Sequence, residues 1–403
     1  MKKYDFDEII ERRGTSCVKH DMMDRIYGTN DLMPMWVADM DFHSPDFVME
    51  AIKQRCNHEV LAYTFGSDSY FEAVINWLKA HYAVTARKEE LHFVPGIVAA
   101  IAFAIQAFTE KGERIMIMPP VYPPFIDLPT FAERELVCCH LKTADGRFAI
   151  DFDDMERKSK GCKMLLLSNP HNPGGTVWSK DDLKRISDIC HKSSTLVISD
   201  EIHADLTLPG FHHTSFSTIS PEAYGNSITF IAPSKTFNIA GMGSSIAYIP
   251  NDTLRKRYFG YLDGYEVANG NVFAYTAAEA AYRHGEEWLR QVRSYIAENV
   301  EFTMNFLHQN MPAVAAMAPE ASFLVWMDFN GTGLTYEEMK SRLLDKAKVA
   351  LNDGYNFGGE RYKGFFRLNI GCPRSVLHEA LGRIAEAFRS YADYARLKQA
   401  SIS

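Results

Sequence analysis

The middle of the chain alternates short apolar runs with segments of helical periodicity. Four runs have the length and the branched or apolar side chains of buried strands, and each is stopped by proline or polar groups; they are residues 114–120, 163–170, 194–201 and 227–234. Between the second and third runs, Ser179 and Asp182 form a capping box that opens an amphipathic helix. Strand, helix and strand in this order predict an α/β fold with a right-handed crossover and a mostly parallel central sheet flanked by helices.

After about residue 285 the alternation gives way to a mixed pattern. In chain order we predict a long helix, a strand, a helical segment, a second strand and a final helix; they cover residues 286–309, 321–329, 335–347, 365–371 and 375–397. The first 45 residues lack the strand and helix alternation as well. We therefore predict a large α/β domain over residues 46–285, and a smaller α+β domain formed by residues 1–45 together with 286–403.

Composition and charge narrow the kind of partner. At 403 residues with 46% hydrophobic and 23% charged residues, the chain has ordinary globular composition. A net charge of −8 gives no reason to expect nucleic acid or an anionic membrane as partner. No apolar stretch approaches the roughly 18 residues of a membrane span, and the start does not resemble a secretory signal. The seven cysteines lack CxxC spacing, so we expect free thiols, no metal site and a cytoplasmic location.

Two candidate residues follow predicted strands, where ligands bind in open parallel sheets. Lys235 directly follows the apolar run 227–234, and partial burial there would free its amine as a nucleophile. A solvated surface lysine is the commoner case for such a residue taken alone. Asp200 ends an apolar strand, where it either caps a turn or pairs, as a buried carboxylate, with a cofactor ring nitrogen.

Two further motifs suit an anionic cofactor. The loop 169–175, Asn-Pro-His-Asn-Pro-Gly-Gly, is stiff and multiply turned; it serves as a turn alone or holds the Asn172 amide toward a cofactor oxygen. Pro95-Gly96-Ile97-Val98 opens an apolar helix over 97–109, either as a plain helix start or as an anion site with free N–H groups. The Ser234 hydroxyl could bind the same phosphate.

The order and separation of these residues resemble those of fold-type I enzymes that use pyridoxal 5′-phosphate (PLP), the aminotransferase class I/II superfamily. The matching residues are Gly96, Tyr122, Asn172, Asp200, Ser234 and Lys235. The resemblance extends from the N-terminal segment to Arg367, nearly the whole chain. It implies that Lys235 carries PLP as a Schiff base and that Tyr122 stacks on the pyridine ring. It also implies that Arg367, otherwise a surface residue on a strand, grips the substrate α-carboxylate. Tyr63 resembles a tyrosine that reaches the neighbouring subunit's cofactor phosphate, which implies a homodimer.

Three features are similar to one branch of that superfamily, the MalY/PatB-type cystathionine β-lyases. Residues 34–42, Pro-Met-Trp-Val-Ala-Asp-Met-Asp-Phe, match its N-terminal signature and include Ala38, a predicted substrate contact. His203 takes the place of a tyrosine found in most aminotransferases, and Gly243 that of a phosphate-binding arginine. Two positions depart from the branch pattern, which usually has tryptophan at His20 and glycine at Ala62.

The branch implies β-elimination from an S-substituted cysteine, which gives pyruvate, ammonia and a thiol. An aminotransferase is the alternative with the same cofactor, because both reactions use the lysine as a base next to the substrate α-carbon. A third hypothesis is a regulatory protein that binds a transcription factor and retains some lyase activity. The choice between these depends on the geometry of the pocket.

Overall fold

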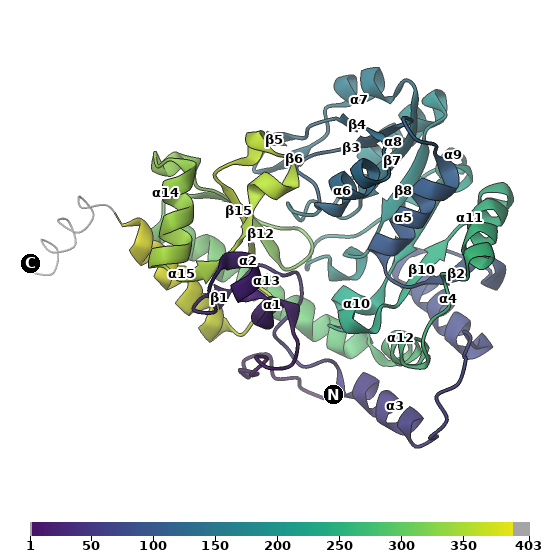
Figure 1. Cartoon of the computed structure of the whole chain (residues 1–403), viewed down its shortest axis with the longest axis horizontal. Coiled ribbons are helices and arrows are strands. Elements are labelled where there is room, and N and C mark those ends of the chain that lie inside the picture. The colour runs from purple at the N-terminus through teal and green to yellow at the C-terminus, as the bar shows by residue number, and fades with distance from the viewer. Residues whose placement is uncertain (1, 390–403) are drawn as a thin grey trace, which may run out of the picture.

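A seven-stranded sheet forms the centre of the larger lobe (Figure 1). The structure is a computed structural model that describes residues 2–389. From edge to edge the strands are β2 (Leu91–Val94), β10 (Ser245–Tyr248), β9 (Ser227–Ile231), β8 (Leu196–Asp200), β7 (Cys162–Ser168), β3 (Arg114–Ile117) and β4 (Glu135–Cys138). The pairs from β9 to β4 are parallel, whereas β10 is antiparallel to both of its neighbours. The predicted mostly parallel sheet is confirmed, and the four predicted strands are its centre.

Helices cover both faces of this sheet. Successive strand residues point to opposite faces, so Ile115 and Ile117 of β3 pack into one apolar cluster and Met116 into another. One face carries α5 (Ile97–Phe108), α6 (Pro124–Phe131) and α11 (Asp252–Tyr265); the other carries α7 (Phe152–Ser159), α8 (Lys180–Ser193) and α9 (Pro221–Gly225). Because both faces are buried, the central strands are continuous apolar runs, which is why the hydrophobic pattern located them.

The predicted capping box begins α8. Ser179 Oγ accepts a hydrogen bond from the Asp182 N–H at 3.0 Å, and Asp182 Oδ2 accepts one from the Ser179 N–H at 3.1 Å.

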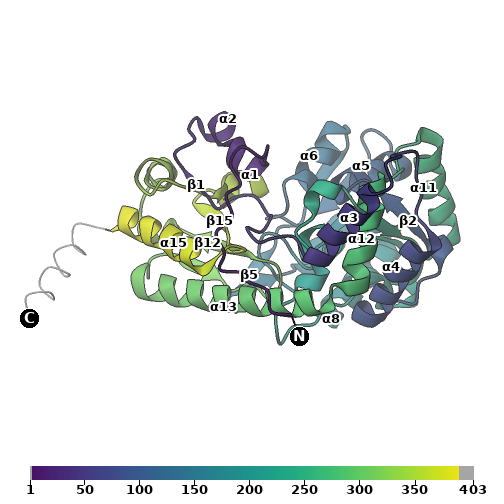
Figure 2. The same cartoon turned by 90° about the horizontal axis from the view of Figure 1, so that it is seen from below.

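Three more helices pack together beside the β2 edge: α3 (Asp46–Cys56), α4 (Asp68–Tyr82) and α12 (Val272–His284). The long helix α13 (Glu286–Asn310) contacts α12 and then runs along α15 (Arg374–Phe388), as Figure 2 shows. It therefore links the two lobes.

The smaller lobe is built on a four-stranded antiparallel sheet. In spatial order its strands are β11 (Ala315–Met317), β12 (Leu324–Asp328), β15 (Phe365–Asn369) and β14 (Asn352–Asp353). The predicted segment 335–347 is α14 (Tyr336–Ser341) followed by a π-helical turn. The predicted final helix is α15, and the part expected beyond residue 389 lies outside the described residues.

The N-terminal segment joins this lobe by strand pairing. It holds α1 (Val18–Asp21), α2 (Met23–Tyr27) and β1 (Met33–Pro34), and β1 pairs in parallel with β13 (Val349–Ala350). A short hairpin, β5 (Lys142–Ala144) with β6 (Arg147–Ala149), extends from the larger lobe. The domain boundaries at residues 45 and 285 stay a prediction.

Two observations bear on the environment of the chain. All seven cysteines are free thiols, and four of them are buried. None of the helices within residues 2–389 is long and apolar enough to cross a membrane. The expectation of unpaired cysteines is therefore confirmed.

Candidate active site

Lys235 lies on α10 (Pro233–Thr236), a single helical turn that directly follows the carboxyl end of β9. Its Nζ donates a hydrogen bond to the Ala38 carbonyl at 2.6 Å. Burial lowers the pKa of the Lys235 amine to about 8; the carboxylates of Asp39 and Asp200 partly offset this effect, and the cation of Arg367 adds to it. The amine is therefore far closer to its neutral, nucleophilic form at physiological pH than a surface lysine would be.

Asp200 ends β8, the neighbouring strand, and is buried. Its Oδ1 accepts a hydrogen bond from the Ile202 N–H at 3.0 Å. Burial raises the pKa of the Asp200 carboxyl to about 7, although the Ile202 N–H lowers it in part. A carboxyl group in this state becomes a stable anion when a cationic donor binds beside it. Asp200 thus accepts a hydrogen bond from the turn that follows β8, and it is also a buried acid whose charge a bound cation would stabilise.

Arg367 and Asn172 come together from opposite lobes. Arg367 Nη1 donates to Asn172 Oδ1 at 2.9 Å, and Nη2 donates to the Trp36 carbonyl at 3.2 Å. The guanidinium carbon lies 5.0 Å from the centre of the Phe357 ring. Burial lowers the pKa of Arg367 to about 10, which leaves it charged at neutral pH. Arg367 is therefore a buried cation rather than a surface residue, and its Nε has no partner among residues 2–389.

His203 and Tyr122 lie close enough to Lys235, Asp200 and Arg367 for these charges to shift their pKa values. Burial and the cations of Lys235 and Arg367 lower the pKa of His203 to about 3, so its imidazole is neutral. Within the described chain, His203 Nδ1 is buried without a hydrogen-bond partner. Burial also raises the pKa of Tyr122, while Arg367 lowers it and Asp200 adds to the rise. The two side chains thus share the site with Lys235, Asp200 and Arg367.

Gly96 lies at the same edge of the sheet as Ser234, because β2 and β9 are both antiparallel to β10 and so run in one direction. Its φ of 115° favours glycine, and a Cβ added there would meet no atom within 4 Å. The helix that follows begins at Ile97 and Val98, whose N–H groups belong to its unsatisfied first turn. A Cβ added at Gly243 would lie 3.7 Å from the Pro95 carbonyl, so this position is next to Gly96.

The segment 34–42 fills the space between β15 and the turn that carries Lys235. Asn238 Nδ2 donates to the Met40 and Phe42 carbonyls at 2.8 and 2.7 Å. From the other side, Asn369 Nδ2 donates to the Val37 and Asp39 carbonyls at 2.5 and 2.6 Å. These bonds place the Ala38 carbonyl, which is the acceptor for Lys235.

A cluster of ion pairs supports the same segment. Arg12 pairs with Asp39 at 2.8 Å and with Asp41 at 2.5 Å, and the buried Lys19 pairs with Asp41 at 2.6 Å. His20 Nε2 lies 3.8 Å from the same Asp41 carboxylate. The departure at His20 therefore belongs to the support of segment 34–42.

Tyr63 stands apart from this group. It is 109% exposed, in the loop that joins α3 to α4. Val60, Leu61 and Phe65 of the same loop are also exposed, at 60%, 60% and 80%. The structure thus brings together every other predicted site residue at one end of the central sheet, and leaves Tyr63 facing outward.

Several residues of the site were not found from the sequence. The Trp36 carbonyl, which accepts from Arg367, carries no side-chain signature; Ala38 was predicted as a substrate contact, but the hydrogen bond from Lys235 to its carbonyl was not. Asn369 and Phe357 act through tertiary contacts to segment 34–42 and to Arg367. Asn238 had a signal in its position three residues after Lys235; in the structure its φ is 52°, which asparagine tolerates better than most residues.

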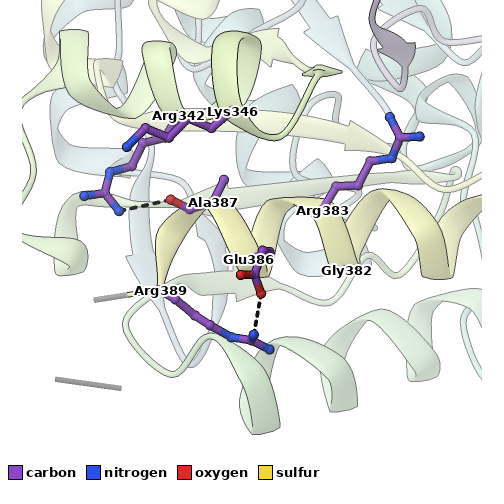
Figure 3. Close-up of a pocket in the computed structure, with 7 residues that line it drawn as sticks. All are labelled: Arg342, Lys346, Gly382, Arg383, Glu386, Ala387 and Arg389. Atoms are coloured by element: carbon purple, nitrogen blue, oxygen red, sulfur yellow. Dashed lines mark hydrogen bonds and ion pairs between the residues drawn. The ribbon is translucent and has the colours of Figure 1, made fainter. Parts of the chain in front are cut away.

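A separate surface depression of about 620 Å³ lies beside α15 (Figure 3). Its lining is rich in cations, and two of them are used locally: Arg342 donates to the Ala387 carbonyl at 3.0 Å, and Arg389 pairs with Glu386. None of the predicted site residues lines it. Across residues 2–389, no group of three or more His, Cys, Asp or Glu side chains is arranged to hold a metal ion.

A buried lysine and a buried carboxylate lie at the carboxyl ends of adjacent parallel strands, and a buried arginine joins them from a second lobe, which is where ligands bind in α/β enzymes with open sheets. Residues 30–384 match the family described as aminotransferase class I and II. The chain belongs to that family.

Individual relatives cover almost the whole chain. It is 41% identical over 386 residues to cystathionine beta-lyase PatB of Bacillus subtilis (95% of this chain, 99% of the relative). It is 31% identical over 392 residues to protein MalY of Escherichia coli (96% and 99%). Among solved structures, cystalysin of Treponema denticola, which contains pyridoxal 5′-phosphate, superposes with a TM-score of 0.92 at 35% identity (96% and 99% covered). The PLP-bound C–S lyase of Staphylococcus hominis does so with 0.90 at 32% identity (96% and 99%).

Proposed function

We propose that the chain is a PLP-dependent carbon–sulfur β-lyase of the cystathionine β-lyase type, which releases pyruvate, ammonia and a thiol from an S-substituted cysteine. The observation that carries this proposal is the buried pair of Lys235 and Asp200 at the strand ends, opposite a buried Arg367. Relatives named cystathionine beta-lyase, and a PLP-bound C–S lyase with nearly the same fold, support it.

The residues present fit PLP by their unsatisfied groups. Burial raises the pKa of Asp200 to about 7, and a cation such as the protonated nitrogen of a pyridine ring would stabilise its charged form. His203 Nδ1 and Arg367 Nε are buried and lack partners within residues 2–389. The open space around Gly96, at the start of α5, suits a phosphate group.

Each predicted residue then has a role in holding the cofactor. Asp200 would bind the ring nitrogen, and Asn172 and His203 would donate to the ring oxygen. Tyr122 would stack on the ring face. The N–H groups of residues 96–98 and the Ser234 hydroxyl would bind the phosphate.

The substrate would be oriented by groups that the structure brings together. Arg367, held by Asn172 and Trp36, binds the α-carboxylate. PLP, when bound, withdraws electrons from the substrate α-carbon and so makes loss of its proton possible. Lys235 takes that proton as general base, which its lowered pKa permits, and the Ala38 carbonyl accepts a hydrogen bond from its N–H. Loss of a thiolate from the β-carbon completes the elimination; the thiolate takes up a proton to become the thiol, and water hydrolyses the released enamine to pyruvate and ammonia.

Gly243 favours the lyase over an aminotransferase. This position lies beside Gly96, where an aminotransferase of the superfamily usually has a phosphate-binding arginine. The lyase branch does not carry that arginine, so a glycine at this position agrees with the lyase hypothesis, whereas an aminotransferase would have to bind the phosphate without the arginine.

The deciding experiment is pyruvate release from cystathionine by the purified protein, without any added keto acid. We expect steady release by the parent, and loss of both release and the absorption band of the lysine-bound cofactor in Lys235→Ala. Lys192→Ala, at an exposed position on α8, is the matched control and should behave like the parent. A strict requirement for a keto acid would instead indicate transamination, and a band that survives in Lys235→Ala would refute the role of Lys235.

We further infer a homodimer in which Tyr63 completes the neighbouring active site. The support is its full exposure in a loop that also exposes Val60, Leu61 and Phe65, an apolar surface of the kind that subunits cover. We also infer a reducing, cytoplasmic location from the seven free cysteines, and a division into domains 46–285 and 1–45 with 286–403.

A further inference from the structure

A buried hydrogen bond ties together the two loops that carry Lys235 and Asp200. Asp205 belongs to a 3₁₀ turn (Ala204–Leu206) that follows β8, five residues after Asp200. Its Oδ2 accepts a hydrogen bond from Thr236 Oγ1 at 2.8 Å, and Thr236 is the residue after Lys235. Asp205 is 6% exposed and Thr236 is fully buried. The bond therefore joins the loop after β8 to the turn after β9, inside the protein.

The other oxygen of Asp205 fixes this pair to a long helix. Oδ1 accepts a hydrogen bond from Trp77 Nε1 at 2.9 Å and another from the Tyr82 hydroxyl. Both donors lie on α4, which contributes none of the residues assigned to cofactor or substrate. Asp205 thus connects the loop after β8 and the turn after β9 to α4, and all three hydrogen bonds are shielded from water.

The turn that carries Lys235 needs such an anchor. A single helical turn has little stability of its own, because fixing its dihedral angles is not repaid by one or two hydrogen bonds. Asn238 holds the far end of the turn against segment 34–42. On the near side, Lys235 itself donates to the Ala38 carbonyl, and the next residue, Thr236, ties the turn to Asp205.

We propose that Asp205 is a positioning residue, which acts through Thr236 to hold Lys235 in register with Asp200 and with the Ala38 carbonyl. The inference rests on the proposed function for the meaning of that register, since Lys235 must reach both the cofactor and the substrate α-carbon. The side-chain hydrogen bonds of Asp205 within residues 2–389 go to Thr236, Trp77 and Tyr82, none of which is assigned to the cofactor or the substrate. Misplacing a base by about 1 Å is enough to slow a proton transfer by orders of magnitude.

The test uses one hydroxyl group. Thr236→Val keeps the shape of the side chain and removes the donor to Asp205, whereas Thr236→Ser keeps the donor. Thr229→Val is the matched control: Thr229 is a buried threonine on β9 whose hydroxyl has no partner among the described residues. Thr236→Ala, which leaves room for a water to reach Asp205, replaces Thr236→Val if the latter does not fold.

Three readouts separate positioning from general support of the fold. The first is the rate at which an amine reagent modifies Lys235 in the cofactor-free protein, followed by peptide mass spectrometry. The second is the pH midpoint of the absorption band of the lysine-bound cofactor. The third is kcat and KM for cystathionine. The charged groups nearest Lys235, which are Asp39, Arg367 and Asp200, are unchanged in all of these variants.

We expect Thr236→Val to lower kcat by about tenfold or more with KM little changed, and to alter both the band midpoint and the labelling rate of Lys235. Thr236→Ser and Thr229→Val should stay within about twofold of the parent. A folded Thr236→Val or Thr236→Ala that matches the parent in all three readouts overturns the proposal. Absence of the band in the parent would refute the proposed function instead, while the labelling comparison would still report on Asp205.

Discussion

Burial shifts the pKa values of Lys235 and Asp200 toward each other. Burial brings the pKa of the lysine down to about 8 and that of the aspartate up to about 7, so the two groups approach each other's range. The sequence indicated that burial would free the Lys235 amine, but the size of both pKa shifts depends on how completely the surrounding chain excludes water. What the sequence did supply was position, since a lysine and an aspartate directly after apolar runs had to lie at one edge of the sheet.

The raised pKa of Asp200 makes the stability of the cofactor-free protein depend on pH. The folded state binds this proton more tightly than the unfolded state, whose aspartate titrates near 3.9. The stabilising contribution is therefore complete below about pH 4 and is lost as pH rises through about 7.

Asp200→Asn cannot ionise, so the cofactor-free variant should be more stable than the parent at pH 8. The difference should shrink by about 1.4 kcal/mol for each pH unit between the two pKa values and vanish toward pH 4. Urea unfolding at several pH values measures it, with Asp181→Asn at an exposed position of α8 as the control. Parallel curves for parent and variant would contradict the raised pKa.

Among the elements, α5 depends on the conformation of one glycine. Gly96 precedes the helix with a φ of 115°, and there is room around it for a side chain. An alanine there would be disfavoured by this backbone conformation and not by contact with neighbouring atoms. The sequence identified this helix start correctly but could not separate an anion site from a plain start, because the two differ only in what the free N–H groups face.

Gly96→Ala should therefore strain the backbone by about 1–3 kcal/mol and weaken PLP binding, because the first turn of α5 must shift to relieve that strain. Gly260→Ala, in the middle of α11 and also without neighbours, is the matched control and should be neutral or slightly stabilising. Spectroscopic titration with PLP and thermal unfolding measure the two effects. Unchanged PLP affinity in a folded Gly96→Ala would show that α5 does not bind the phosphate.

For the molecule as a whole, the sequence predicted the fold class because buried parallel strands have a distinctive apolar pattern. It did not locate β2, β4 or β10. These strands lie at or near the edges of the sheet, and their short segments, such as Leu-His-Phe-Val in β2, mix polar with apolar residues. The packing of segment 34–42 between the lobes was likewise beyond local pattern, although its residues were recognised as a signature.

The proposed dimer can be tested by mixing two inactive chains. If Tyr63 serves the neighbouring site, a hybrid of Tyr63→Ala with Lys235→Ala has one complete site. Random pairing of equal amounts should then give about a quarter of the parent activity, well above the sum of the separate variants. Mixed subunits should be unfolded and refolded together, and activity measured as pyruvate release. No gain on mixing would place Tyr63 and Lys235 in the same site or in none, and the parent refolded in the same way is the control.

The bonds that place segment 34–42 also set the order in which the chain can mature. Lys235 meets Ala38 across 197 positions, and Arg367 meets Trp36 across 331. During synthesis the segment leaves the ribosome early, yet its partners on β15 emerge only after more than 300 further residues. Contacts so distant along the chain form late, since the intervening loop must first be closed. The part of the protein that is made first is thus among the last to reach its place, and catalytic competence marks the end of folding.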